Sequence, residues 1–322
     1  MPILIAGLKR LEYRGYDSCG LALLNSGLKV FKDKGRIGEL EKRLPPDGNA
    51  IVGIGHTRWA THGVPSLVNA HPHLDCTSTI AVVHNGTIAN FQSLKDKLME
   101  KGHCFVSETD TEVLAHLIEQ YYQGNLEQAV EQALSEVEGS YALIALRASQ
   151  PELVVARRES PLVIGLGERE NLVASDVPAL LDYTDRVLYL EDGDIGVVTD
   201  RGVKLNNSHK AVSRPEHRIP WTVEDAQKGG YEHFMLKEIH EQPRVLRETF
   251  KGRLSAVEPT INLGIDLGPR PDNILLLACG TSYHAALVGK YLLESLARIP
   301  TRTEVASEFN SAETALSKSL AI

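Results

Sequence analysis

Four short runs of the sequence combine residue types that could bind or activate a small substrate. The first run, HTRWATHG at residues 56–63, follows an apolar stretch at residues 51–54. The planar guanidinium of Arg58 suits a carboxylate, and Trp59 offers a large apolar surface with one N–H donor. A surface loop with a tryptophan buried for packing explains the same residues equally well. This run alone leaves both interpretations open.

The second run, VHNG at residues 83–86, ends another apolar stretch. The side-chain amide of Asn85 and the backbone N–H of Gly86 could together hold a developing oxyanion. Asn-Gly is also a strong signal for a tight β-hairpin turn, and the local sequence by itself favours that turn.

The third run, SETDTE at residues 107–112, precedes a helical pattern at residues 113–122. Asp110 could bind an ammonium group. However, Ser or Thr followed three residues later by Glu is a capping box, and acidic side chains stabilise the start of a helix. Helix capping therefore explains most of this run and is favoured on local evidence.

The fourth run, Cys279-Gly280-Thr281-Ser282, lies between an apolar run and a helical pattern. Free N–H groups at a helix start, with the hydroxyls of Thr281 and Ser282, predict a phosphate site. A turn capped by Thr or Ser is the alternative. The strand–turn–helix context favours phosphate. The lysine of a Walker loop is missing, so a nucleoside triphosphate is not expected.

No metal and no cofactor is expected from the spacing of ligand-type residues. His71-Pro72-His73 has no cysteine or carboxylate at ligand spacing, so a structural role is favoured. The four cysteines form no C-x-x-C pair, which excludes a zinc ribbon or a disulfide scaffold and indicates a reducing, cytoplasmic compartment.

Composition narrows the class of protein further. The 322 residues carry 34 Lys and Arg against 42 Asp and Glu, so the net charge of −8 predicts no binding to nucleic acid. A hydrophobic content of 43% excludes a wholly disordered chain. No apolar run approaches the ~18 residues of a membrane span, and the N-terminus lacks the features of a secretory signal.

The elements that must position these runs change in character near residue 200. Before it, apolar strand-like runs come in sets, and so do helical patterns, which lie at residues 2–11, 88–101, 111–122 and 126–137. This order differs from strict βαβ alternation and predicts packed, largely antiparallel sheets with covering helices. Residues 206–218 are polar and predict an exposed connector. Residues 234–250 form an amphipathic pattern that Pro243 kinks or splits into two helices. The sequence then predicts a parallel α/β domain, with a strand at residues 273–278, a helix that ends at residue 297 and a strand at residues 303–306.

Read in chain order, these runs belong to a longer series of motifs: RLEYRGYDS at 10–18, HTRWATHG at 56–63, NAHPH at 69–73, VHNG at 83–86, SETDTE at 107–112, KEIHEQP at 237–243 and LACGTSY at 277–283. Over essentially the whole chain this series closely resembles the glutamine–fructose-6-phosphate aminotransferase (isomerizing) family, the glucosamine-6-phosphate synthases. KEIHEQP and CGTS disfavour the purine-pathway amidotransferases, which share the glutaminase motifs.

The resemblance implies a fold and a division into domains. Residues 1–215 would form an N-terminal-nucleophile glutaminase domain, an αββα sandwich within the mixed α/β class. Residues 216–250 would be a linker, and residues 251–322 the first part of a SIS-type, doubly wound parallel α/β domain. The full-length family would act as a homodimer in the cytoplasm, without a membrane or nucleic-acid partner.

The resemblance also implies roles for individual residues. The family releases ammonia from glutamine and uses it to convert fructose 6-phosphate to glucosamine 6-phosphate. Matched position by position, Arg58 would bind the α-carboxylate of glutamine and Asp110 its α-ammonium, while Asn85 and Gly86 would form the oxyanion hole. The remaining matches are Thr61 and His62 in the glutamine pocket, Trp59 at the ammonia channel, and Thr281 and Ser282 at the sugar phosphate.

Two departures from the family pattern bear on activity. The family nucleophile is an N-terminal cysteine whose α-amino group acts as the base, whereas this sequence begins Met1-Pro2. Cys19 stands where the family has a small residue and is not expected to replace it. A second phosphate loop would follow Ile322. We therefore expect a fragment that lacks both half-reactions; a non-catalytic module that binds glutamine or a sugar phosphate is the alternative.

Overall fold

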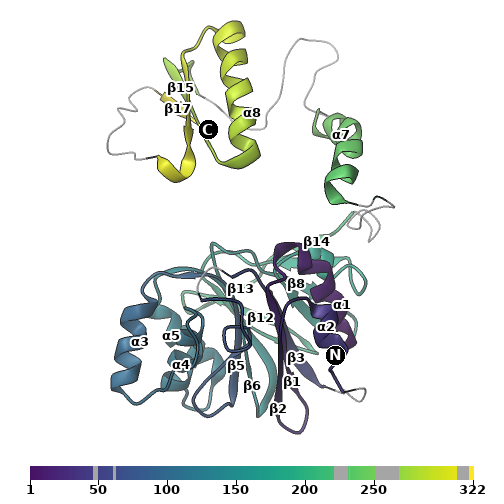
Figure 1. Cartoon of the computed structure of the whole chain (residues 1–322), viewed down its shortest axis with the longest axis vertical. Coiled ribbons are helices and arrows are strands. Elements are labelled where there is room, and N and C mark those ends of the chain that lie inside the picture. The colour runs from purple at the N-terminus through teal and green to yellow at the C-terminus, as the bar shows by residue number, and fades with distance from the viewer. Residues whose placement is uncertain (46–49, 61–62, 221–230, 232, 251–267, 310–318) are drawn as a thin grey trace. The chain divides into compact units, whose positions relative to one another are not determined.

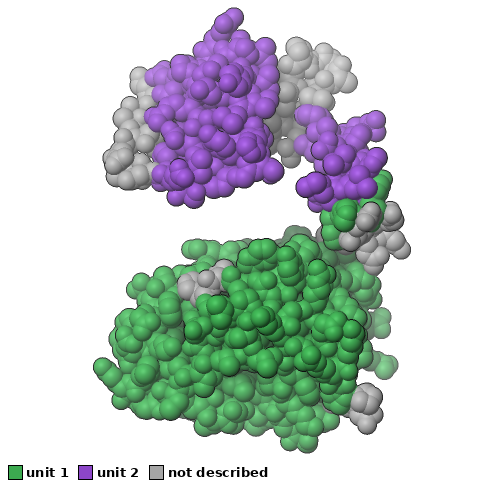
Figure 2. All heavy atoms as spheres, in the orientation of Figure 1, with its two compact units in different colours: residues 1–234 green, residues 235–322 purple. Residues whose placement is uncertain are grey.

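The computed structural model describes residues 1–45, 50–60, 63–220, 231, 233–250, 268–309 and 319–322 (Figure 1). They form two compact units, Met1–Phe234 and Met235–Ile322, which are coloured separately in Figure 2. Each unit contains its own β-structure. No helix within these described ranges is long and apolar enough to cross a lipid bilayer.

The first unit contains three antiparallel sheets. The largest has seven strands in the order β13-β12-β11-β7-β6-β5-β4, and the two smaller sheets have the orders β2-β1-β3 and β14-β10-β8-β9. The strands are β1 Ser18–Leu24, β2 Leu28–Lys34, β3 Val52–Arg58, β4 His73–Leu74, β5 Ile80–Ile88, β6 Gly139–Arg147, β7 Gln150–Arg158, β8 Val163–Leu166, β9 Asn171–Ala174, β10 Arg186–Tyr189, β11 Asp194–Thr199, β12 Gly202–Asn207, β13 Lys210–Val212 and β14 Glu216–Arg218.

Helices cover the outer faces of these sheets (Figure 1). Helices α3 Phe91–Glu100, α4 Glu112–Tyr121 and α5 Leu126–Ser135 pack on one face of the seven-stranded sheet. Helices α1 Pro2–Leu11 and α2 Ile37–Glu41 pack against β1. Short 3-10 turns occupy Glu12–Arg14 and Val177–Ala179. The result is the layered helix–sheet–sheet–helix arrangement that the resemblance implies, so the expected fold class is confirmed.

Strand β5 shows why the sequence produces these layers. Ile80 and Val82 pack against the helices α3–α5, whereas Ala81 and Val83 pack in the second core, between the sheets. Because side chains of a strand alternate between the two faces, a strand covered on both faces has to be apolar at every position. The continuous apolar run Ile80–Val83 therefore marks the part of β5 that is covered on both faces.

The expected hairpin turn at Asn85-Gly86 is wrong. Strand β5 continues to Ile88 and pairs with β6 along its whole length, including Gly86 opposite Tyr141. Gly86 has φ +132°, and a Cβ atom there would lie 2.1 Å from the carbonyl oxygen of Ser140. The glycine is therefore required by a close backbone approach inside a paired strand rather than by a turn.

The expected connector at residues 206–218 is also wrong. Strands β12 and β13 form a hairpin at the edge of the seven-stranded sheet, with Leu205 opposite Val212, and β14 pairs with β10. Leu205 and Val212 pack into the core between the sheets, while most of their neighbours are exposed. Strands at the edge of a sheet are short and bury only one face, so each contributes only one or two apolar residues. Such a weak pattern does not distinguish these strands from a connector.

The second unit contains a three-stranded parallel sheet. Its strands β15 Asn273–Ala278, β16 Thr301–Val305 and β17 Ser319–Ala321 have the order β16-β15-β17. Helix α8 Gly280–Leu292 and its π-helical end Leu293–Ala297 connect β15 to β16, as the predicted parallel α/β unit requires, and Ala306–Glu308 is a 3-10 turn. Helix α7 Phe234–Phe250 runs through Pro243 as one helix, so the alternative of two separate helices is wrong.

Four histidines of the first unit, His56, His71, His73 and His84, have pKa values that burial lowers. The rings of His56 and His71 stack with centroids 4.1 Å apart, and His73 Nε2 lies 3.0 Å from the hydroxyl of Thr109. Burial lowers the pKa of His56 to about 4, the pKa of His73 to about 3, and the pKa values of His71 and His84 below the ordinary value. All four imidazoles are therefore neutral at pH 7.

We expect acid to destabilise the first unit through these histidines. In the unfolded chain the imidazoles bind protons near their ordinary pKa of about 6.5, but in the folded unit they stay neutral to lower pH. Stability is therefore fully present above about pH 6.5 and is lost as the pH falls. His56, with its pKa of about 4, would contribute at most about 3 kcal/mol of this loss.

Urea unfolding followed by circular dichroism at pH 7 and pH 5 measures this loss. His71→Gln should reduce the difference between the two pH values, whereas His209→Gln, at a side chain that is 82% exposed, should leave it unchanged. A free energy of unfolding that does not depend on pH in this range would contradict the prediction.

Candidate active site

Three of the four sequence runs expected to bind a substrate meet at one cavity of the first unit. The cavity has a volume of about 790 Å³ and is lined by Arg58 and Trp59 at the end of β3, Asn85 and Gly86 on β5, and Asp110 before α4. It also borders β3 and β9, which are the terminal strands of their two sheets. Three motifs that lie far apart in the sequence therefore face a common space.

Arg58 and Asp110 bring opposite charges to this cavity. Their exposed fractions are 4% and 6%. Asp110 is anchored to β5 because its Oδ2 accepts a hydrogen bond of 2.8 Å from the backbone N–H of Ile88. Burial lowers the pKa of Arg58, and the carboxylates of Asp110 and Asp17 oppose this effect. A buried cation and a buried anion at one cavity suit a zwitterionic ligand such as an α-amino acid.

The side chain of Asn85 is oriented by His56. His56 Nε2 donates to Asn85 Oδ1 across 2.9 Å, so the amide nitrogen of Asn85 remains available as a donor. Because burial lowers the pKa of His56 to about 4, the imidazole stays neutral and keeps this role at physiological pH. An amide N–H group beside the N–H of Gly86 can stabilise negative charge on a tetrahedral intermediate.

The loop after Arg58 is fixed by Asp17. Asp17 donates its backbone N–H to the carbonyl of Arg58 (2.9 Å), and its Oδ2 accepts from the N–H of Ala60 (2.9 Å). This loop holds Trp59 at the rim of the cavity, where its side chain is 56% exposed and edge-on to Tyr16, with ring centroids 5.7 Å apart. Thr61 and His62, which the resemblance also assigns to the pocket, lie outside the described residues.

The segment that carries Asp110 is held by Glu112 in a way that differs from a capping box. Thr111 is the N-cap of α4 and makes no side-chain cap hydrogen bond. Instead, the carboxylate of Glu112 accepts from the backbone N–H groups of Val106 (2.9 Å) and Ser107 (2.7 Å). The capping interpretation of this run is therefore wrong in detail, because Glu112 folds the preceding segment back on the helix.

Asn69, which lies in the segment before β4, also holds the segment that carries Asp110. Asn69 Oδ1 accepts from the backbone N–H of Glu108 (3.0 Å), and Asn69 Nδ2 donates to the carboxylate of Glu108 (3.0 Å). Sequence reasoning missed Asp17, His56, Asn69 and Glu112 as positioning residues. All four stand inside or beside the motifs, but the long-range partners that define their roles cannot be read from spacing.

None of the described residues that line the cavity is a cysteine. Cys19 is 1% exposed and packs with Ile5, Leu21 and Ile37 in the core beneath α1 and α2. Burial raises the pKa of the Cys19 thiol to about 12. A buried thiol with so high a pKa is not a nucleophile at neutral pH.

Thr281 and Ser282 lie in the second unit, in the first turn of α8, and both are exposed. The N-cap of this helix is Cys279, which makes no side-chain cap hydrogen bond. The two hydroxyls therefore stand beside the backbone N–H groups of a helix start.

Comparisons with known proteins agree on both units. Residues 56–182 match the family model of the glutamine amidotransferase domain, and residues 270–320 match that of the SIS domain. The glutamine–fructose-6-phosphate aminotransferase (isomerizing) of Thermus thermophilus is 51% identical over 313 residues, and that of Pyrococcus horikoshii is 49% identical over 316. Each match covers 95% of this chain and 52% of the relative, so the chain spans about half the length of the curated relatives it matches.

A solved structure supports the fold independently. The glutamine phosphoribosylpyrophosphate amidotransferase of B. subtilis, in complex with ADP and GMP, matches 94% of this chain and 62% of its own, with a TM-score of 0.58 and 24% sequence identity. At that identity the likeness concerns the fold alone. Identity near 50% along almost the whole chain, with both domain matches, shows that the chain belongs to the family of glutamine–fructose-6-phosphate aminotransferases (isomerizing), which are transferases.

Proposed function

We propose that the cavity of the first unit binds glutamine for an enzyme that converts fructose 6-phosphate to glucosamine 6-phosphate. The observation that carries this proposal is the pair of opposite buried charges, Arg58 and Asp110, at one cavity with Asn85 and Gly86. Arg58 would pair with the α-carboxylate and Asp110 with the α-ammonium. The carboxamide of glutamine would then extend toward Asn85 and Gly86.

The proposed hydrolysis of glutamine follows from the hydrogen-bond donors of Asn85 and Gly86 in the cavity. A thiolate attacks the carboxamide carbon, and the carbonyl oxygen takes up the negative charge. The side-chain amide of Asn85 and the N–H of Gly86 stabilise that charge. The α-amino group of the cysteine, having taken the thiol proton, returns it to the nitrogen, which leaves as ammonia, and water then hydrolyses the remaining thioester to glutamate and the free thiol. The family supplies the thiolate from an N-terminal cysteine. The terminal strands β3 and β9, which both border the cavity, offer edges at which the strand carrying such a cysteine could pair.

The second unit would begin the sugar-phosphate half of the enzyme. Thr281 and Ser282, at the start of α8, would bind the phosphate of fructose 6-phosphate through hydroxyl and backbone N–H groups. Trp59 would gate the path of ammonia toward that half. The proposal includes no cofactor, a homodimer for the full-length family protein and, from the scattered cysteines, a cytoplasmic location.

A second candidate function is a module that binds glutamine or a sugar phosphate without chemistry. The observation that favours it is the cavity, whose described lining contains the charged residues but no cysteine. Binding and turnover experiments separate the two candidates.

We expect Arg58→Ala and Asp110→Asn each to weaken glutamine binding by at least thirtyfold. Each substitution leaves one charge of the ligand unpaired in a buried site, which costs about 2–5 kcal/mol. Isothermal titration calorimetry with the 322-residue chain measures the effect. Arg186→Ala is a matched control, because Arg186 pairs with Glu216 on the surface, outside the cavity. Equal affinity of Arg58→Ala and wild type would show that glutamine does not bind as proposed.

We also expect the 322-residue polypeptide to release no ammonia from glutamine. Adding an N-terminal segment that begins Cys-Gly-Ile-Ile-Gly, with a free α-amino group on the cysteine, should create this activity. The same segment with serine at its first position is the control for the thiol, and Arg58→Ala should again reduce kcat/KM by more than tenfold. Glutamine binding without any ammonia release from the extended chain would favour the non-catalytic module.

A further inference from the structure

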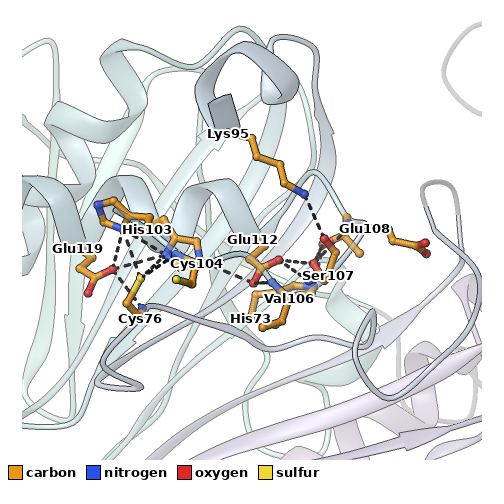
Figure 3. A network of polar contacts seen from close by, with 12 residues as sticks. His73, Cys76, Lys95, His103, Cys104, Val106, Ser107, Glu108, Glu112 and Glu119 are labelled. Atoms are coloured by element: carbon orange, nitrogen blue, oxygen red, sulfur yellow. Dashed lines mark hydrogen bonds and ion pairs between the residues drawn. The ribbon is translucent and has the colours of Figure 1, made fainter. Parts of the chain in front are cut away.

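A cluster of ligand-type side chains lies away from the cavity, on the side of the seven-stranded sheet that carries the helices (Figure 3). Cys76 is in the turn between β4 and β5, and His103 follows α3. His116 and Glu119 stand one helical turn apart on α4. None of the four lines the glutamine cavity. Their side chains come from three separate segments and point at one another.

The four ligand atoms lie within 4.8 Å of one another, and five of their six separations are close to those of a tetrahedral metal site. Cys76 Sγ lies 3.6 Å from Nδ1 of His103 and 3.4 Å from Nδ1 of His116, and the two Nδ1 atoms are 3.4 Å apart. Glu119 Oε2 lies 3.0 and 3.5 Å from the same two nitrogens. Zinc bonds of about 2.3 Å to sulfur and about 2.0–2.2 Å to nitrogen or oxygen give tetrahedral edges of about 3.5 and about 3.4 Å.

Hydrogen bonding alone does not account for these five close approaches. The carboxylate brings no proton, the thiol brings one, and each imidazole Nδ1 brings at most one. At most three of the five contacts can therefore be hydrogen bonds. A cation at the centre would satisfy all four atoms through their lone pairs.

The outer nitrogens of both imidazoles already face oxygen atoms. His103 Nε2 lies 3.3 Å from Gln120 Oε1, and His116 Nε2 lies 3.6 Å from Glu112 Oε1. Metal-binding histidines commonly direct their second ring nitrogen to a carboxylate or carbonyl oxygen. A proton on Nε2 leaves Nδ1 as an acceptor. Both rings are therefore oriented with the ligating nitrogen toward the centre of the cluster.

The backbone supports the two ligands that are not histidines. The N–H of Cys104 lies 3.5 Å from Cys76 Sγ and donates toward it, which stabilises a thiolate. The N–H of Cys76 donates to Glu119 Oε2 across 3.1 Å. The turn that carries Cys76 is itself fixed, because Asp75 Oδ1 accepts from the N–H groups of Thr79 and Ile80, both at 2.7 Å.

We propose that Cys76, His103, His116 and Glu119 bind a zinc ion in a structural site. Four protein ligands leave no open position for substrate, which is the pattern of a structural rather than a catalytic zinc. A tetrahedral set of one thiolate, two imidazoles and one carboxylate suits zinc better than calcium or magnesium, which prefer oxygen ligands.

The proposed zinc site connects two parts of the chain: the start of the segment between α3 and α4, which contains Asp110, and helix α4, which follows that segment. His103 and Asp110 stand near the two ends of the stretch between α3 and α4. Between them, Ser107 donates its backbone N–H and its hydroxyl to Glu112, both at 2.7 Å, and Glu112 faces His116. Zinc would thus hold the segment through direct bonds to His103 and His116 and would restrict the position of Asp110.

Metal analysis and cobalt spectroscopy test the proposal on the whole chain. After removal of metal with a chelator, Zn²⁺ should bind at about one equivalent per chain and raise the melting temperature. Co²⁺ should give the strong visible absorption of tetrahedral cobalt together with a thiolate-to-cobalt charge-transfer band. Cys76→Ser should remove the charge-transfer band, and Cys76→Ser and His103→Ala should each weaken binding by more than tenfold.

Cys104→Ser is the matched control. Cys104 is an exposed neighbour whose thiol is directed at the carbonyl of Gly102, 3.9 Å away, so its substitution should leave Zn²⁺ affinity and the cobalt spectrum unchanged. Zn²⁺ affinity and the cobalt spectrum do not depend on glutamine turnover. Because His103 is only partly buried, His103→Ala should not prevent folding. Absence of Zn²⁺ and Co²⁺ binding at micromolar concentration, or equal loss in Cys104→Ser and Cys76→Ser, would overturn the proposal.

Discussion

The continuous pairing of β5 with β6 is the constraint on which the cavity depends. From Ile80 to Ile88 the two strands stay in register, and Asn85 and Gly86 lie inside this paired stretch. The close approach of Gly86 to the Ser140 carbonyl leaves no room for a side chain. Because Asp110 accepts a hydrogen bond from the N–H of Ile88, the donors proposed for an oxyanion and the carboxylate proposed for an ammonium group belong to one framework.

Glu112 connects this framework to the proposed zinc site. Its carboxylate accepts hydrogen bonds from Val106 and Ser107 on one side and faces His116 on the other. Burial raises the pKa of Glu112, but the neighbouring His116 and the hydrogen bonds from Val106 and Ser107 outweigh this effect and lower the pKa to about 2, so the group stays ionised. A buried carboxylate with several donors gives the segment before α4 one preferred conformation. The proposed glutamine site and the proposed zinc site therefore share a structural element without sharing any residue.

The sequence predicted the family and the fold class better than the local geometry. The motifs around Arg58, Asn85 and Asp110 indicated the layered fold, and their combination with KEIHEQP and CGTS identified the family. The Asn85-Gly86 turn was wrong because local turn propensity was outweighed by pairing with β6, a long-range effect. Sequence reasoning missed the proposed zinc ligands for a related reason. Its cysteine and first histidine are 27 residues apart, so no short spacing pattern connects them.

Trp59 has a consequence for how this protein can be observed. The sequence contains only two tryptophans, and Trp59 lines the cavity with 56% of its side chain exposed. An indole in water emits at longer wavelength than an indole in apolar surroundings. A ligand or chain segment that covers the rim of the cavity would therefore shift the emission of Trp59 toward the blue. The residue that stands over the pocket is in this way an intrinsic optical reporter of its occupancy, and no label has to be attached.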